Sequence, residues 1–387
     1  MSGCPNKGSL RQFLRFPPVF DIRGKLPLNP KRLISILPIR RYKVRNMAIT
    51  KELPVLTPWD DQSALTQDAT LERPMSPAQA QKIAVSKKPS WLKVRLPGGS
   101  EYQKIKGLLR ERKLATVCEE AQCPNIAECW ASGTATIMIG TEICTRACRF
   151  CAVKTARRPP ALDPNEPRHV AETIAALKLR YVVLTSVDRD DLPDGGAEHF
   201  AKTIRAIKAL DPSIIVEALV PDFKGDPGCV ETVIHSGVDV YAHNVETVKR
   251  LQYRVRDPRA GYEQSLGTLR YAKTFAEANQ IQLYTKSSIM LGLGESEVEL
   301  MHAFHDLRKI DVDVLTLGQY LRPTKKHLPV EKFYSPDEFE TLKSAAEKKG
   351  FLYVAAGPMV RSSYRAAELF LKGLVTRGRE SDPRRKA

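Results

Sequence analysis

The pattern of short apolar runs after residue 135 constrains the fold of this 387-residue chain more than any other feature. Six runs of β-favouring residues alternate with helical patterns at intervals of about 25 to 45 residues. Such alternation is typical of repeated βα units that build a parallel sheet. We expect the strands at residues 136–140, 181–186, 214–219, 238–243, 283–290 and 312–317.

The expected strands are nearly continuous in apolar residues, which indicates a sheet covered by helices. Between them, residues 196–210 place Phe200, Ile204 and Ile207 on one helical face, and residues 262–279 form a second helix. Six such units predict an α/β fold, a partial parallel (β/α)6 barrel of the TIM type. Barrels of this kind carry their chemistry on the loops after the carboxyl ends of the strands.

The net charge of +17 is unevenly distributed. Residues 1–50 contain eleven Lys or Arg and one acid, Asp21, so this segment accounts for +10 and leaves +7 for the rest. A basic balance favours acidic partners, which include nucleic acid, anionic membranes and acidic protein domains. The chain has no run of 18 apolar residues that would span a membrane.

The basic leader has two interpretations. An arginine-rich, acid-poor start resembles a mitochondrial presequence, although six prolines in the first fifty residues disfavour an amphipathic helix. Alternatively, Met47 is the true start. We therefore expect a cytoplasmic protein, with the mitochondrial matrix as the alternative.

Six of the eight cysteines fall within residues 118–151. A chain of this size has no need of disulfides, and no signal peptide opens it, so cluster or metal ligation in a reducing compartment is the better interpretation. Cys144, Cys148 and Cys151 form a C-x3-C-x2-C loop after the first expected strand. Three thiolates this close can bind three irons of a cubane cluster and leave its fourth iron open. A zinc site would need a fourth ligand nearby, and none is adjacent.

A second set lies upstream, where Cys118, Cys123 and Cys129 form a C-x4-C-x5-C run. The downstream loop, with Phe150 before its last cysteine, resembles the signature of the radical S-adenosylmethionine (SAM) superfamily. Both sets together resemble lipoyl synthase in particular. The similarity covers roughly residues 90–375 and includes the segments 117–121, 185–191, 194–198, 241–247, 255–259, 290–295, 316–320 and 360–364.

The resemblance implies two 4Fe-4S clusters and SAM as cofactors. Cys144, Cys148 and Cys151 would hold the catalytic cluster, whose open iron binds SAM. Cys118, Cys123 and Cys129 would hold an auxiliary cluster, with Ser363 as its fourth ligand. The bland alternative for Ser363 and its neighbour Ser362 is a cap on a helix that starts at residue 364.

The implied reaction is insertion of sulfur at C6 and C8 of an octanoyl group that is amide-linked to a lysine of a carrier protein. The auxiliary cluster would donate the sulfur. The implied partners are octanoylated lipoyl domains of 2-oxoacid dehydrogenases (E2), the glycine-cleavage H protein, and an electron donor such as ferredoxin or flavodoxin. Neither nucleic acid nor a membrane is an expected partner. The sequence does not specify the preferred carrier, the physiological reductant, the route of cluster repair or the oligomeric state.

Seven polar or glycine residues after the expected strands are candidate SAM contacts, each with a charged turn as the alternative. They are Asp194, Gly195, Gly196, Asn244, Glu246, Gly292 and Glu295. Two rival functions remain: another radical SAM enzyme with an auxiliary cluster, and a zinc-stabilised basic nucleic-acid-binding module.

These features divide the chain into five parts. We expect a basic, largely irregular leader and N-terminal extension, an auxiliary-cluster segment, a radical SAM barrel, a C-terminal segment with the Arg361-Ser-Ser-Tyr364 motif, and a basic tail. Their ranges are 1–89, 90–134, 135–335, 336–375 and 376–387.

Overall fold

The computed structural model describes residues 89–92, 100–112, 114–120, 123, 125–126, 129 and 136–363. The chain divides into two units, Met1–Ala69 and Thr70–Ala387, and all described residues belong to the second. The leader, the start at Met47, the helix expected after residue 363 and the basic tail lie outside the described residues.

The described residues contain an eight-stranded sheet whose neighbours follow one another in chain order, β1-β2-β5-β6-β7-β8-β9-β10. All pairs from β2 to β10 are parallel, and β1 pairs antiparallel with β2. The strands are β1 (Ala115–Thr116), β2 (Thr136–Ile139), β5 (Tyr181–Ser186), β6 (Ile215–Leu219), β7 (Val240–Ala242), β8 (Tyr284–Leu291), β9 (Val314–Gln319) and β10 (Tyr353–Gly357). A separate two-stranded sheet pairs β3 (Ile143–Cys144) with β4 (Lys154–Thr155).

The predicted parallel α/β fold is confirmed, and all six predicted strands are present. Strand β10 adds a seventh parallel strand beside β9, and β1 adds an antiparallel edge. Neither was predicted, because β1 has only two residues and the β10 sequence Tyr-Val-Ala-Ala-Gly has a single β-branched residue. Within the described residues β10 does not pair with β1 or β2, so the barrel is partial.

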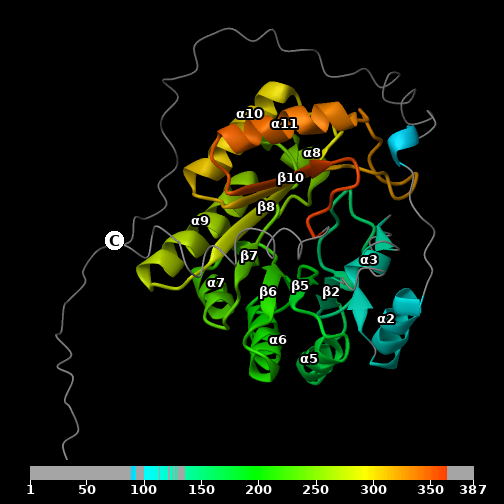
Figure 1. The fold of residues 1–387 in the computed structure, drawn as a ribbon, viewed down its shortest axis with the longest axis vertical. Helices are drawn as coiled ribbons and strands as arrows, with labels where there is room; N and C mark the ends of the chain where they lie inside the picture. The colour runs from blue at the N-terminus through cyan, green and yellow to red at the C-terminus, as the bar shows by residue number, and fades with distance from the viewer. Residues whose placement is uncertain are drawn as a thin grey trace, which may run out of the picture. The chain divides into compact units, whose positions relative to one another are not determined.

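Helices lie on the outside of the parallel strands (Figure 1). The described helices are α2 (Ser100–Glu111), α3 (Val117–Glu120), α5 (Glu166–Ala176), α6 (Ala197–Leu210), α7 (Pro227–Ile234), α8 (Gln252–Val255), α9 (Tyr262–Ala278), α10 (Glu297–Lys309) and α11 (Pro336–Lys348), with short 3-10 turns η1 (Ser90–Leu92), η2 (Phe223–Gly225) and η3 (Lys249–Leu251). The two predicted helices are α6 and α9. Capping boxes start α10 and α11, where the Ser296 and Ser335 hydroxyls accept backbone N–H donors.

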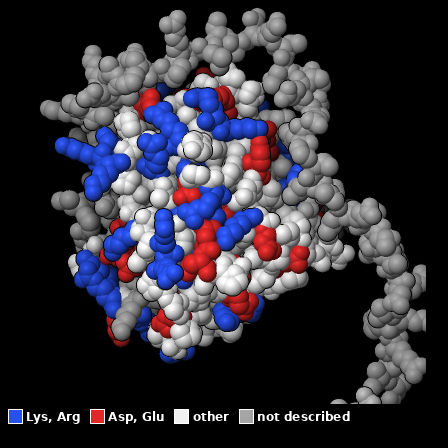
Figure 2. Space-filling model, turned by 180° about the vertical axis from the view of Figure 1, so that it is seen from behind, with Lys and Arg blue, Asp and Glu red and all other residues white. Residues whose placement is uncertain are grey.

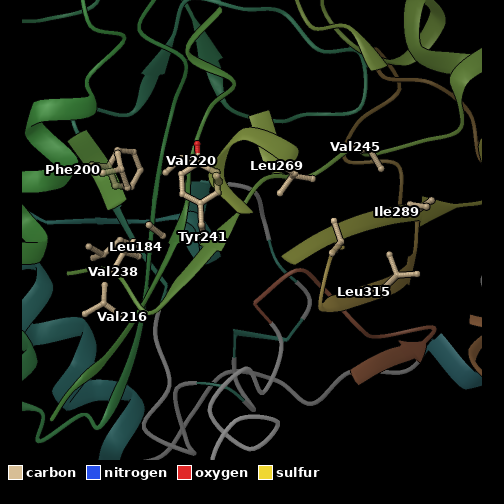
Figure 3. Close-up of a cluster of buried hydrophobic side chains, with 14 of the residues drawn as sticks. Leu184, Phe200, Val216, Val220, Val238, Tyr241, Val245, Leu269, Ile289 and Leu315 are labelled. Atoms are coloured by element: carbon tan, nitrogen blue, oxygen red, sulfur yellow. The ribbon is translucent and has the colours of Figure 1, made fainter. Parts of the chain in front are cut away.

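Alternate residues of each strand belong to two different hydrophobic cores. Val182 and Leu184 of β5 face the helices and pack in the main core, part of which is drawn in Figure 3 around Tyr241 and Phe200. Tyr181 and Val183 instead belong to a smaller cluster with Ile215, Val240 and Tyr284 from β6, β7 and β8. Since successive side chains of a strand point to opposite faces, this second cluster fills the interior of the barrel. The space above it, at the carboxyl ends of the strands, is left for chemistry.

Within the described part of the chain, no helix combines the length and the apolar character needed to cross a membrane.

Candidate functional site

A cavity of about 500 Å³ lies at the carboxyl ends of the strands. Both cysteine sets reach it: Cys144, Cys148 and Cys151 line it together with Cys118 and Cys123. Ser362 and Ser363 line the same cavity from the C-terminal segment. Cys129 is buried in the adjoining core rather than on the cavity wall. The structure therefore brings the sequence-predicted cluster ligands to one place.

The C-x3-C-x2-C loop is fixed to the ends of the neighbouring elements by backbone hydrogen bonds. Thr145 donates both its N–H (3.0 Å) and its hydroxyl (2.9 Å) to the Asp188 carbonyl, which follows β5. The Arg149 N–H donates to the Val255 carbonyl at 2.9 Å. Ala147 N–H donates to the Asp257 carboxylate at 2.9 Å. The loop is thus held from two sides by elements distant in sequence.

Arg146, the second residue after Cys144, is the main electrostatic anchor of this loop. Its guanidinium is 2% exposed and pairs with Asp222 at 2.7 Å, Asp190 at 2.9 Å and Asp188 at 3.2 Å. Although burial raises the pKa of Asp222, the hydrogen bonds from Arg146 dominate and lower it to about 2. The ion pairs therefore tie the cysteine loop to the ends of β5 and β6.

The sulfur atoms of the loop accept backbone hydrogen bonds. Arg146 N–H donates to Cys144 Sγ and Asp257 N–H to Cys148 Sγ, both at 3.3 Å. Burial raises the thiol pKa of Cys144 and Cys148 to about 12 and that of Cys151 to about 11. Metal ligation requires thiolates, and bound iron supplies the positive charge that offsets burial. Buried thiols with N–H donors aimed at sulfur fit an iron–sulfur cluster.

Among the described residues, no three His, Cys, Asp or Glu side chains meet closely enough to hold a single metal ion. The thiolates of a cubane cluster bind different iron atoms, so this result concerns single-ion sites alone.

The upstream cysteine set is tied to the C-terminal segment. Cys118 lies in α3, and the Cys123 N–H donates to its carbonyl at 2.9 Å. Asn125 then donates its side-chain N–H to the Met359 carbonyl at 2.5 Å, across 234 residues of sequence. Burial raises the pKa of Cys123, and the positive charge of Arg361 opposes that rise. The segment that ends in Ser363 therefore lies against the upstream set.

A glycine in β9 allows this approach. A Cβ atom at Gly318 would come within 2.1 Å of the Val360 carbonyl oxygen. Only glycine permits the backbone to pass so close. Gly318 thus seats residues 360–363 over the carboxyl end of β9.

Of the predicted SAM contacts, Asn244 and Glu246 line the cavity. The Asn244 Nδ2 donates to Glu246 Oε1 at 3.1 Å, while its buried Oδ1 has no hydrogen-bond partner among the described residues. Burial raises the pKa of Glu246, whose backbone takes the left-handed conformation with φ of 65°. A buried acceptor without a partner fits a ligand that supplies a hydroxyl or amino donor.

The other five predicted SAM contacts do not line this cavity. The Asp194 carboxylate accepts from the Gly196 and Glu198 N–H groups at 3.0 and 2.9 Å and so starts α6, beside Gly195. The Glu295 carboxylate accepts from the Gly292 and Leu293 N–H groups at 2.5 and 2.9 Å. The cavity lining gives their predicted SAM role no support, and that role stays a prediction.

Two cavity residues to which the sequence analysis gave no role are His243 and Arg256. Burial lowers the pKa of His243 to about 4, so its ring is neutral and both nitrogens are engaged, with the Val220 carbonyl and the Ser265 hydroxyl at 2.9 Å. Arg256 donates to the same hydroxyl at 2.7 Å. Both residues lie in segments that resemble the family, His243 in 241–247 and Arg256 in 255–259, and this resemblance was the signal that could have found them.

The fold and the open cysteine loop define a class, the radical SAM enzymes. In agreement, residues 138–307 match the model of the Radical SAM superfamily, and residues 60–123 match the N-terminal domain of lipoyl synthase of the Radical SAM family. The chain is 58% identical over 280 residues to a lipoyl synthase of Halorhodospira halophila (strain DSM 244 / SL1), covering 72% of this chain and 83% of that protein.

Two relatives carry organelle names. A chloroplastic lipoyl synthase of Ricinus communis is 59% identical over 294 residues, covering 75% of this chain and 80% of that protein. A mitochondrial lipoyl synthase of Danio rerio is 56% identical over 292 residues, covering 74% and 72%. The chain belongs to the lipoyl synthase family. It is accordingly a radical SAM enzyme, which uses a 4Fe-4S cluster and SAM.

Proposed function

We propose that the enzyme inserts two sulfur atoms, at C6 and C8, into an octanoyl group amide-linked to a carrier-protein lysine, with an auxiliary 4Fe-4S cluster as the sulfur donor. The observation that carries this proposal is one cavity that is lined by the whole downstream cysteine set, by two cysteines of the upstream set (Cys118 and Cys123) and by Ser363. A radical enzyme that only abstracts hydrogen needs one cluster. A second cluster held beside the same cavity would offer its sulfide to the substrate.

Cys144, Cys148 and Cys151 would hold the catalytic cluster, with the N–H groups of Arg146 and Asp257 directed at two of the sulfurs. When bound, this cluster and SAM supply a 5′-deoxyadenosyl radical that abstracts hydrogen from an unactivated carbon. The partnerless Oδ1 of Asn244 would accept a hydrogen bond from SAM, held in place by the contact between Asn244 and Glu246.

Cys118, Cys123, Cys129 and Ser363 would hold the auxiliary cluster. A serine oxygen is a hard ligand that is poorly matched to a soft iron–sulfur site. It can therefore be released when the cluster gives up sulfide, whereas a fourth thiolate would stabilise the cluster against disassembly. The hydrogen bond from Asn125 to the Met359 carbonyl supports this proposal, because it links the upstream set to the segment that ends in Ser363.

The remaining cavity wall suits a saturated chain. Met138 of β2, Leu219 of β6 and Met290 of β8 line it with apolar surface. Such a lining binds an alkyl chain by removing it from water.

The partners that we propose are octanoylated lipoyl domains of E2 subunits, the glycine-cleavage H protein, and a ferredoxin or flavodoxin. The proposed compartment is the cytoplasm, with the mitochondrial matrix as the alternative. The rival nucleic-acid-binding function finds no support on the face shown in Figure 2, where Lys and Arg side chains are interspersed with Asp and Glu rather than forming one basic surface.

The test is an anaerobic assay with the reconstituted full chain, SAM, dithionite and an octanoylated carrier peptide, followed by mass spectrometry. We expect addition of two sulfur atoms to the octanoyl group and about two 5′-deoxyadenosine per lipoyl group, one for each C–H bond that is broken. Formation of 5′-deoxyadenosine without sulfur in the peptide would refute the proposal in favour of another radical SAM reaction.

A further inference from the structure

Four exposed side chains lie on three segments that contact one another at the C-x3-C-x2-C loop. They are Arg149, Tyr253, Lys325 and Lys326, which together we call the outer basic surface. Tyr253 of α8 is 82% exposed, which is unusual for a large aromatic residue. None of the four lines the cavity.

Hydrogen bonds join the three segments that carry this surface. Arg149 donates its N–H to the Val255 carbonyl at 2.9 Å, next to Tyr253. The Arg149 carbonyl accepts from the Leu328 N–H at 3.2 Å, and the His327 ring contacts the Cys151 carbonyl at 2.9 Å. The outer basic surface is therefore built directly onto the backbone of the catalytic cluster ligands.

The charges of this surface are available to a partner. Among the described residues, Arg149, Lys325 and Lys326 have no carboxylate within ion-pair distance, whereas the neighbouring Arg254 and Arg259 pair with Glu331 and Asp257. Exposed cations without carboxylate partners, on segments that adjoin an exposed tyrosine, are the kind of feature that binds an acidic protein surface, since the tyrosine supplies apolar area and the cations supply orientation.

We propose that the outer basic surface docks an acidic one-electron carrier protein that reduces the catalytic cluster, an inference that rests on the proposed function. In this step the carrier is oxidised by one electron and the cluster falls from the 2+ to the 1+ state; no bond forms or breaks. Electron transfer weakens steeply with distance, so a donor must dock where cluster ligands lie close beneath the surface. The acyl carrier has a different requirement, because it must deliver its chain into the cavity.

The decisive experiment compares two reductants on the full-length, reconstituted enzyme. A flavodoxin reduced to its hydroquinone must dock, whereas dithionite reduces the cluster without docking. The variant is Lys325→Glu/Lys326→Glu. Its matched control is Lys348→Glu/Lys349→Glu, an equal charge change at the exposed end of α11, before β10 and therefore at the opposite end of the strands.

We expect the first variant to need about tenfold more flavodoxin for half-maximal 5′-deoxyadenosine formation, with its dithionite-driven rate unchanged and the control unaffected in both assays. The wild-type flavodoxin requirement should also rise with salt, because exposed charges are screened. Equal flavodoxin requirements in variant and control would overturn the docking surface. So would a variant that keeps the wild-type flavodoxin requirement but loses binding to anionic vesicles or DNA.

A second variant tests whether the effect comes from lost docking rather than from damage to the cysteine loop. Tyr253→Ser removes the exposed ring without changing charge, and we expect it to raise the flavodoxin requirement about threefold while iron content stays at the wild-type value. An unchanged requirement in this variant would contradict the role of the tyrosine. Failure of sulfur insertion with dithionite in the wild-type enzyme would instead refute the proposed function, so the two failures are distinguishable.

Discussion

The two cysteine sets face one cavity but are held in different ways. The C-x3-C-x2-C loop is held by many contacts from several parts of the barrel, since Arg146 makes ion pairs with three carboxylates and backbone N–H groups contact the sulfur atoms. The upstream set depends on the distant C-terminal segment, which Asn125 contacts through Met359. We infer that the first site retains its cluster during turnover, whereas the second allows its cluster to be taken apart and replaced.

The largest expected effect is on the iron content of the protein, which distinguishes the two sites. Cys144→Ala/Cys148→Ala/Cys151→Ala should lower the iron content of the reconstituted protein from about eight to about four per chain, because one of two ligand sets is lost. SAM cleavage should be abolished. Iron analysis and chromatography of 5′-deoxyadenosine measure both. Cys229→Ala is the control, since Cys229 is a buried thiol that belongs to neither set; continued cleavage in the triple variant would disprove the assignment.

The next prediction tests the permanence of the catalytic loop. Arg146→Met leaves Asp222, which is fully buried, without its cation, so the free energy of unfolding should fall by about 3 to 5 kcal/mol. Urea unfolding measures this. Arg168→Met is the control, because its ion pair with Glu172 is exposed and screened by solvent, so its loss should hardly change the free energy of unfolding. Similar losses in both variants would show that Arg146 is no special anchor.

Residue pattern alone predicted the parallel sheet and the open cysteine loop, because both are local: apolar runs define strands, and three cysteines lie within eight residues. The prediction of Ser363 as a ligand of the auxiliary cluster came from the family resemblance, since nothing in its own sequence distinguishes it from a helix cap. The pairing of Arg146 with Asp222, 76 residues apart, left no trace in the sequence. The same holds for the contact of Asn125 with Met359, because a single long-range hydrogen bond imposes no periodicity.

The third prediction tests exchange at the auxiliary site. Ser363→Cys should retain 5′-deoxyadenosine formation but form lipoyl product at least about tenfold more slowly, because a thiolate is a softer and tighter ligand for iron. Ser363→Ala should also cleave SAM while sulfur transfer suffers. Ser362→Ala, which changes the neighbouring hydroxyl on the same cavity wall, should behave like the wild type. If Ser363→Ala forms lipoyl product at the wild-type rate with a fully occupied auxiliary cluster, Ser363 is only a helix cap.

The smallest expected effect sharpens the comparison most, because it changes no ligand. Asn125→Ala removes the hydrogen bond that ties the upstream set to the C-terminal segment and leaves the Met359 carbonyl without that donor. A lost hydrogen bond of this kind costs about 1 to 3 kcal/mol. If the auxiliary site depends on this tie, auxiliary iron should fall severalfold in occupancy after reconstitution, while dithionite-driven SAM cleavage stays at the wild-type rate.

Asn279→Ala is the matched control for this prediction, since Asn279 also donates its side-chain N–H to a backbone carbonyl, that of Phe275 at 2.9 Å, but at an exposed helix end. It should keep full iron content. Equal loss of iron and of SAM cleavage in Asn125→Ala would mean that the two sites form one cooperative unit. In that case the distinction between a permanent and an exchangeable site would fail, because loss of one cluster would destabilise the other.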